Sequence, residues 1–126
     1  MEKFYYKNQL IGIRIKRIIL GSNPLTNPKE PLQLVSLKHP KGSYLRAHLH
    51  EPKKRTTESL QECLVIIKGK IKLDLYGLDK RSFKKIFLSQ GEVFLLVRGG
   101  YGIHFLEDSE IFELKNGPFK EDKILI

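Results

Sequence analysis

The residues with the clearest chemical potential lie in one short stretch, Tyr-Leu-Arg-Ala-His-Leu-His, at positions 44–50. Successive side chains of a β-strand point to opposite faces. The even-numbered positions are therefore expected to share one face of a strand: Tyr44, Arg46, His48 and His50. Two imidazoles at positions i and i+2 can bind one metal ion, and imidazole also serves as an acid or base near neutral pH. The stretch predicts a polar pocket with His48, His50 and Arg46 as catalytic candidates and Tyr44 in its lining.

The spacing around this stretch resembles the first conserved motif of the cupin superfamily. Five residues separate Gly42 from His48, one residue separates His48 from His50, and six residues separate Glu62 from Gly69. The resemblance implies that His48, His50 and Glu62 are metal ligands on adjacent strands. It also implies a divalent ion such as Zn, Fe, Mn or Ni, because imidazole and carboxylate suit all four.

The link between the second histidine and Glu62 is longer than the motif usually has. Its residues 51–58 are polar and turn-prone, which predicts a surface loop at the mouth of the pocket. Glu51 and Glu58 are alternative carboxylates, but a strand fixes the direction of a side chain better than a loop does. We therefore expect Glu62 to be the carboxylate ligand.

The second cupin motif is followed less closely. Its outline is matched by Gly91, followed after five residues by Val97-Arg98-Gly99. At position 102, however, the motif has histidine and this chain has glycine. His104 stands two residues later and is expected on the same strand face, about 6.5 Å further along. The resemblance implies that His104 completes the metal site or lines the pocket. Tyr101 is expected to lie over the pocket opening.

Hydrophobic patterning predicts an all-β chain with little helix. Short apolar runs are separated by glycine-marked turns, and the only candidate helix, at 57–61, would make little more than one turn. The resemblance implies a cupin-type double-stranded β-helix, or jelly-roll barrel, as a single domain over 1–126. Its core would span 42–115, and residues 1–40 would add strands that pair with a second subunit in a homodimer. The predicted strands are 11–16, 32–38, 44–50, 62–67, 70–76, 85–88, 93–97, 103–106 and 111–115, and the predicted loop is 21–31.

The amino-acid composition indicates which kinds of partner and which cellular compartment to expect. The net charge of +9 comes mostly from lysines spread along the chain, without the arginine and aromatic clusters typical of nucleic-acid binding. We expect no nucleic-acid partner, no membrane span and a small-molecule ligand that is anionic or sugar-like. The single cysteine, Cys63, cannot form an internal disulfide and is expected to be a buried, inert thiol in a cytoplasmic protein.

Three functions are compatible with these residues. The first is a metal-dependent cupin enzyme with isomerase, epimerase or lyase chemistry. The second is a metal-free acid–base enzyme similar to cupin-type sugar-nucleotide ketoisomerases, which the Arg46-x-His48-x-His50 pattern resembles, with Arg46 contacting a diphosphate. The third is a cupin that binds a small molecule without catalysis. Cupins carry out many reactions, so the resemblance does not select among these functions.

Overall fold

Ten β-strands and no helix make up the protein, and the computed structural model describes all residues from 1 to 126. None of its segments forms a helix long and apolar enough to cross a membrane. The predicted all-β class is therefore confirmed. The strands are β1 (Glu2–Tyr6), β2 (Gln9–Ile15), β3 (Gly21–Pro24), β4 (Val35–Lys38), β5 (Glu62–Lys68), β6 (Lys70–Tyr76), β7 (Ser82–Ser89), β8 (Val93–Leu96), β9 (Gly100–Phe105) and β10 (Glu110–Lys115).

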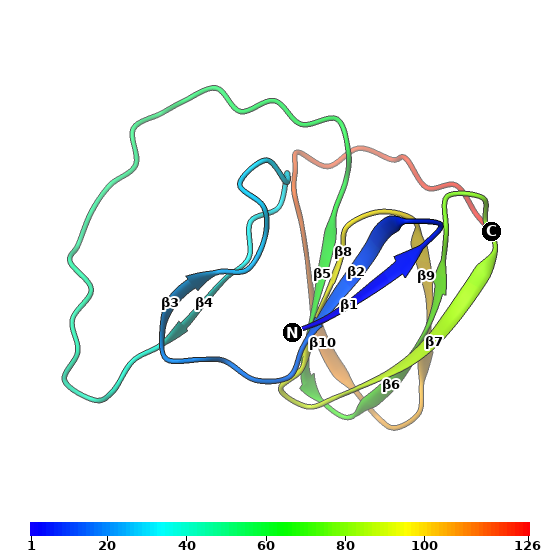
Figure 1. Cartoon of the computed structure of the whole chain (residues 1–126), viewed down its shortest axis with the longest axis horizontal. Helices are drawn as coiled ribbons and strands as arrows, with labels where there is room; N and C mark the ends of the chain where they lie inside the picture. Colours follow the sequence, from blue (N-terminus) through cyan, green and yellow to red (C-terminus); the bar gives the residue numbers. More distant parts are fainter.

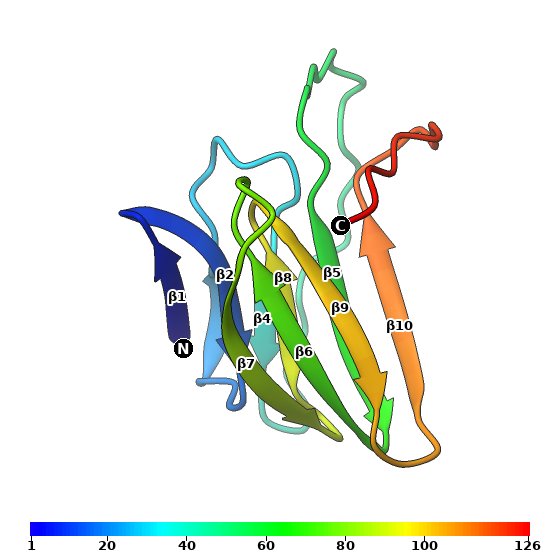
Figure 2. The same cartoon turned by 90° about the vertical axis from the view of Figure 1, so that its right-hand side faces the viewer.

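Two antiparallel sheets form the body, and a two-stranded ribbon of β3 and β4 lies outside them (Figures 1 and 2). The larger sheet has the strand order β1-β2-β8-β5-β10, and the smaller sheet has the order β7-β6-β9. The expected closed barrel is not formed. β9 pairs only with β6, and β10 pairs only with β5, so each sheet ends in a strand with a free edge.

The main core lies between the two sheets. Alternation along the strands turns apolar side chains of both sheets toward each other, which removes them from water and stabilises the stack. Phe94 on β8 is fully buried in this core and occupies the space above Gly12. A Cβ at position 12 would collide with the Phe94 ring, with Cε2 only 2.8 Å away, so glycine is required there for close packing. The core residues are Phe4, Ile11, Leu64, Ile66, Ile71, Leu73, Leu75, Ile86, Leu88, Phe94 and Leu96.

A second apolar cluster covers the outer face of the larger sheet. Here the segment that joins β3 to β4 packs over the sheet through Leu25, Leu32 and Leu34. The buried Gln61 side chain fastens this segment: its amide nitrogen donates to Glu30 at 2.6 Å and to the Val97 carbonyl at 3.2 Å. The cluster thus fixes the β3–β4 ribbon on the body. The buried members of the sheet are Ile13, Ile15, Cys63, Leu95 and Val97.

Most predicted strands are present, but the structure differs from the prediction at four places. β1 was not predicted, and the loop expected at 21–31 contains β3, which pairs with β4. The candidate helix at 57–61 is not formed.

The largest difference is at 44–50, which is not a strand. No backbone N–H or C=O of residues 44–60 is hydrogen-bonded to another backbone group. Residues 39–60, here called the arm, instead form an extended loop that leaves the body beyond β4 and returns at β5 (Figure 1). A strand exists only where a neighbour pairs with it, and here the arm has no neighbour.

Candidate functional site

A cluster of polar side chains lies at one end of the space between the sheets. Glu62 is the first residue of β5, and strand alternation places it on the same inner face as Leu64 and Ile66. Tyr101 comes from β9 in the opposite sheet, where its ring packs edge-on against Phe94 at a centroid distance of 6.4 Å. The Tyr101 hydroxyl forms a short hydrogen bond with the Glu62 carboxylate. The cluster therefore joins the two sheets through a phenol and a carboxyl group.

A second carboxyl group shares the same hydroxyl. Glu113 on β10 lies 3.2 Å from the Tyr101 oxygen through Oε1. A phenol has one proton, so it can donate to only one of the two carboxylates. A proton on one carboxyl group, donated to the Tyr101 oxygen, would satisfy both contacts and relieve the repulsion between the two carboxylates. The geometry of the cluster thus favours holding one extra proton.

The titration of these groups follows from their surroundings. Burial raises the pKa of Glu62, and the neighbouring Glu113 raises it further, while the hydrogen bond from Tyr101 and the charge of Lys115 act in the opposite direction. Burial also raises the pKa of Tyr101 well above its ordinary value, and the adjoining Glu62 and Glu113 add to this. Tyr101 therefore remains a proton donor at neutral pH, and burial together with the charge of Glu113 favours the protonated form of Glu62.

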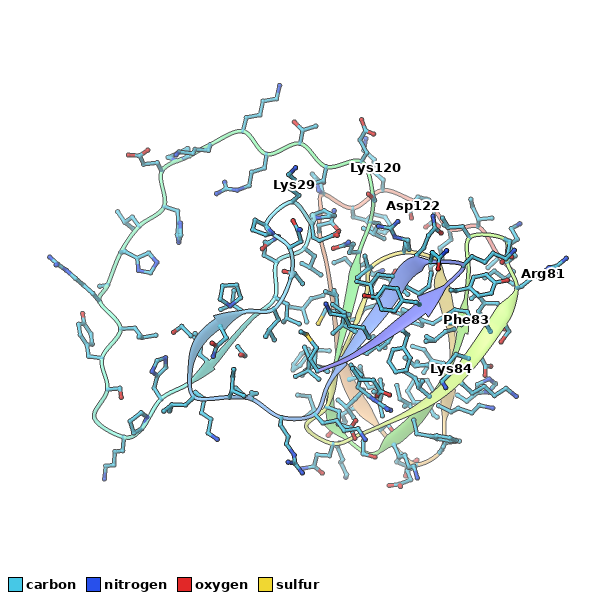
Figure 3. The ribbon with its side chains drawn as sticks, in the orientation of Figure 1. Lys29, Arg81, Phe83, Lys84, Lys120 and Asp122 are labelled. Carbon is cyan, nitrogen blue, oxygen red and sulfur yellow. The ribbon has the colours of Figure 1, made fainter.

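A cavity of about 730 Å³ opens beside Glu62. This volume lies within the range of small-molecule binding sites. Its walls are residues 57–60 at the end of the arm, Glu62, Lys115 and the C-terminal residues 116–123. Figure 3 shows Lys120 and Asp122 of this segment along the upper edge of the body. The wall carries both signs of charge, with Lys115, Lys120 and Lys123 as its cations.

His48 and His50 lie on the arm, exposed to solvent and away from this cluster. Their ring centroids are 4.9 Å apart, so the expected closeness of the two imidazoles is present without a strand. Nδ1 of His48 lies 3.1 Å from the carbonyl oxygen of Arg46, and the Tyr44 hydroxyl accepts a 3.3 Å hydrogen bond from the Ala47 N–H. The structure does not bring His48 and His50 together with Glu62, and it contains no group of three residues arranged to hold a metal ion.

His104 lies on the opposite side of the smaller sheet from Glu62, so the expectation that it faces the interior is wrong. Tyr101 and Ile103 occupy the inner face of β9, and alternation places Gly102 and His104 on the outer face. There Nε2 of His104 lies 2.6 Å from the carboxylate of Asp74 on β6. The expected metal set of His48, His50, Glu62 and His104 is therefore spread over the arm, the inner face of the larger sheet and the outer face of the smaller sheet.

Replacing His104 with alanine should move the pKa of Asp74 back toward its ordinary value of 3.8. The hydrogen bond from His104 is the main cause that lowers the Asp74 pKa, and Lys72 adds a smaller effect. The variant loses that hydrogen bond, so the carboxylate is less stabilised. An NMR titration of the Asp74 carboxyl carbon measures the change. An unchanged Asp74 titration would show that the His104–Asp74 contact is not formed in solution.

Glu113, Lys115 and the C-terminal segment are the parts of this site that sequence analysis did not identify. The pattern Ile111-x-Glu113-x-Lys115 places these three side chains on one strand face, and that alternation is the available signal. Tyr101 was expected over the opening and instead reaches the centre of the cluster. Cys63, beside Glu62 in sequence, points to the outer cluster, and burial raises its pKa to about 11, as expected of an inert thiol.

No protein family, curated protein or solved structure matches this chain.

Replacing Glu62 with glutamine should stabilise the protein increasingly as the pH rises above about 4.5. The pKa of Glu62 is higher in the folded protein than its unfolded value of 4.5, so protonated Glu62 favours the folded state. This contribution to the free energy of unfolding is fully present below pH 4.5. It is lost as the pH rises through the native pKa. Glutamine cannot ionise and so avoids this loss. Urea unfolding from pH 4 to pH 8 would show the difference in unfolding free energy growing and then levelling off.

The matched control is Glu107→Gln, which makes the same change at an exposed turn position. Subtracting its pH dependence removes any general effect of lost negative charge. A Glu62→Gln difference that stays constant over this pH range would contradict the raised pKa.

Proposed function

We propose that this protein is an acid–base enzyme with a cupin-type β-sandwich, acting on a small anionic or sugar-like molecule. The observation that carries the proposal is the Tyr101 hydroxyl shared between the Glu62 and Glu113 carboxyl groups beside a cavity of about 730 Å³. Packing of the two sheets does not require such an arrangement, whereas a proton-transfer site requires a proton donor and a proton acceptor within hydrogen-bond reach of each other. Perturbed pKa values are also typical of such sites.

The chemistry that suits this cluster is movement of a carbon-bound proton next to a carbonyl group. A deprotonated carboxylate of the Glu62–Glu113 pair would take the proton from carbon, and the Tyr101 hydroxyl would donate a hydrogen bond to the carbonyl oxygen as negative charge develops there. Returning the proton to the same or the neighbouring carbon gives epimerisation or isomerisation. No proton is gained or lost overall.

The net positive charge of the chain supports an anionic substrate, and the cavity wall offers three lysines beside four acidic residues, Glu58, Glu62, Glu121 and Asp122. Lys115, Lys120 and Lys123 line the cavity, and the chain as a whole carries a net charge of +9. Lysine binds phosphate as a point charge, and a positive field raises the local concentration of anions. Nucleoside-diphosphate sugars and sugar phosphates are therefore the first compounds to test.

A thermal-shift screen with these two classes of compound tests the proposal. A ligand that binds only the folded protein raises the melting temperature with its concentration. Hits are then incubated with the protein in D₂O, and incorporation of one deuterium at carbon is measured by mass spectrometry. Binding with deuterium incorporation supports the enzyme, whereas binding without it supports a non-catalytic binding protein. No stabilisation by any member of either class would contradict the proposal.

A metal-dependent function is the second candidate, and the paired imidazoles of His48 and His50 favour it. Their ring separation of 4.9 Å fits two ligands of one divalent ion, with Zn, Fe, Mn and Ni all compatible. Such an ion would supply Lewis-acid chemistry at these two histidines, because Glu62 of the same chain lies away from them. Elemental analysis of protein purified without a chelator or a histidine tag is the test. His50→Ala should then abolish metal retention, and unchanged metal content would remove His50 from the site.

A further inference from the structure

Two neighbouring strand edges of the body are unpaired. β9 ends the smaller sheet and β10 ends the larger one, and each has only one paired neighbour. The two strands follow each other in the chain and lie at the same side of the body, where Tyr101 of β9 meets Glu113 of β10 (Figure 2). A free edge presents unpaired N–H and C=O groups that readily pair with another strand. The two free edges therefore lie next to the polar cluster of Glu62, Tyr101 and Glu113.

The arm contains a segment with the side-chain pattern of a strand but without a pairing neighbour. Its residues 44–50 alternate polar and apolar side chains, as expected of a strand, yet they make no backbone hydrogen bonds within the chain. Leu49 is 97% exposed and Tyr44 is 78% exposed. Exposed apolar side chains that gather in one segment are available for contact with another surface. The arm therefore has the pattern that a free β-edge would accept.

The charges of the arm and of the β9–β10 region are complementary. Residues 106–113 carry four acidic and no basic side chains, and the arm carries five basic side chains against two acidic ones. Attraction between these opposite charges favours docking of the basic arm beside the acidic β9–β10 region. The acidic residues are Glu107, Asp108, Glu110 and Glu113, and the basic residues are Lys41, Arg46, Lys53, Lys54 and Arg55.

We propose that residues 44–50 of one copy pair with the free edge of β9 in a second copy and deliver His48 and His50 to its Glu62–Tyr101 cluster. The β9 edge is paired with the arm of a second copy and not with the arm of its own chain, because both ends of the arm are fixed on the body that carries them. The β3–β4 ribbon before the arm is held by the outer cluster, and Gln61 after the arm is buried. Between them the arm extends away from its own body (Figure 1). Reciprocal exchange of identical arms gives a closed symmetric dimer.

The polar face of the arm is the one that fits inside. At this end the space between the sheets is lined by Glu62, Tyr101 and Glu113, which can hydrogen-bond to imidazole and guanidinium groups. On the outer face of β9, a Cβ placed at Gly102 would meet no atom within 4 Å, so there is room for the leucines of the arm. Arg46, His48 and His50 would then stand beside the proton-transfer cluster. This part of the inference rests on the proposed function of that cluster.

Oligomeric state measured by light scattering, with two proline variants, tests the exchange. Wild-type protein at tens of micromolar should have close to twice the 14.6 kDa mass of one chain. The double variant Arg46→Pro/Leu49→Pro should be monomeric. N–H groups of odd and even positions point to opposite edges of a strand, so one of the two prolines removes an N–H that faces β9, and neither N–H is hydrogen-bonded within its own chain. Lys54→Pro, in the same arm but outside 44–50, is the matched control and should remain a dimer.

Isotope-filtered NMR identifies which chain supplies the histidines. In a mixed dimer of ¹³C-labelled and unlabelled chains, ring protons of His48 or His50 in one copy should show contacts to the Tyr101 ring of the other. A Tyr101→Phe partner assigns that signal. Contacts within a single chain, a monomeric wild type, or a dimeric Arg46→Pro/Leu49→Pro variant would each overturn the exchange. If these interchain contacts are present but the ligand screen finds no compound that binds, the arm exchange stands and the proposed function fails.

Discussion

Replacing Gly69 with alanine should lower the free energy of unfolding by about 3 kcal/mol, from two additive causes. Gly69 forms the turn between β5 and β6 with φ of +91°, a left-handed conformation that costs an L-residue roughly 1–2 kcal/mol. In addition, a Cβ there would lie 2.6 Å from the Asp108 carbonyl oxygen and 2.8 Å from the Ser109 Cα. Backbone atoms cannot rotate away, so the β5–β6 turn or the β9–β10 turn must shift, at a cost of roughly 1–3 kcal/mol.

Gly91→Ala is the control that separates these causes. Its φ of +84° is almost the same, but a Cβ at position 91 would meet no atom within 4 Å. Gly91→Ala should therefore cost only the conformational part, roughly 1–2 kcal/mol. Urea unfolding of both variants gives the two free energies. Equal losses would show that the contact between the two turns is not formed in solution.

The strands predicted best from the sequence are those that lie between two other strands in a sheet and alternate between core and surface. β6 was predicted with its observed limits, because Lys70–Tyr76 alternates between the core and the outer face without interruption. β3 was missed because Asn23 and Pro24 are unusual in strands. Pro24 is tolerated there because β3 pairs only with β4, so its other edge needs no N–H. β1 was missed although the turn after it, at Lys7 and Asn8, has the two positive φ angles of a tight hairpin.

The site was predicted in part, for reasons that alternation makes clear. Alternation relates the faces of neighbouring residues but does not say which face is inside. Gly102 and His104 do share a face, as predicted, yet Ile103 packs on the core and turns that shared face outward. At 44–50 alternation predicted that the two histidines lie close together. It could not predict whether a neighbouring strand pairs with this segment, because that depends on residues far away in the chain. Glu62 was identified because its strand continues into the apolar run Leu64–Ile66.

The largest functional effect is expected from the Tyr101–Glu62 pair. Glu62→Gln and Tyr101→Phe should each lower the rate of deuterium incorporation into the bound substrate by about 10²- to 10⁴-fold, which is the usual contribution of a positioned acid or base. This corresponds to about 2.7–5.5 kcal/mol in activation free energy. Glutamine cannot accept the carbon-bound proton, and phenylalanine cannot donate a hydrogen bond to the carbonyl oxygen. The rates are measured by mass spectrometry on the compound found in the screen.

Two controls make the same chemical changes away from the cluster. Tyr76→Phe removes a hydroxyl from β6, on the face of the smaller sheet opposite Tyr101, and Glu107→Gln neutralises an exposed turn carboxylate. Both should keep the wild-type rate, because neither group contacts the cluster of Glu62, Tyr101 and Glu113. Glu62→Gln should also flatten the pH dependence of the rate, since the group with the raised pKa is gone. A Glu62→Gln enzyme with the wild-type rate and pH profile would show that the proton is moved by other groups, and the histidines of the arm would then be the bases to test.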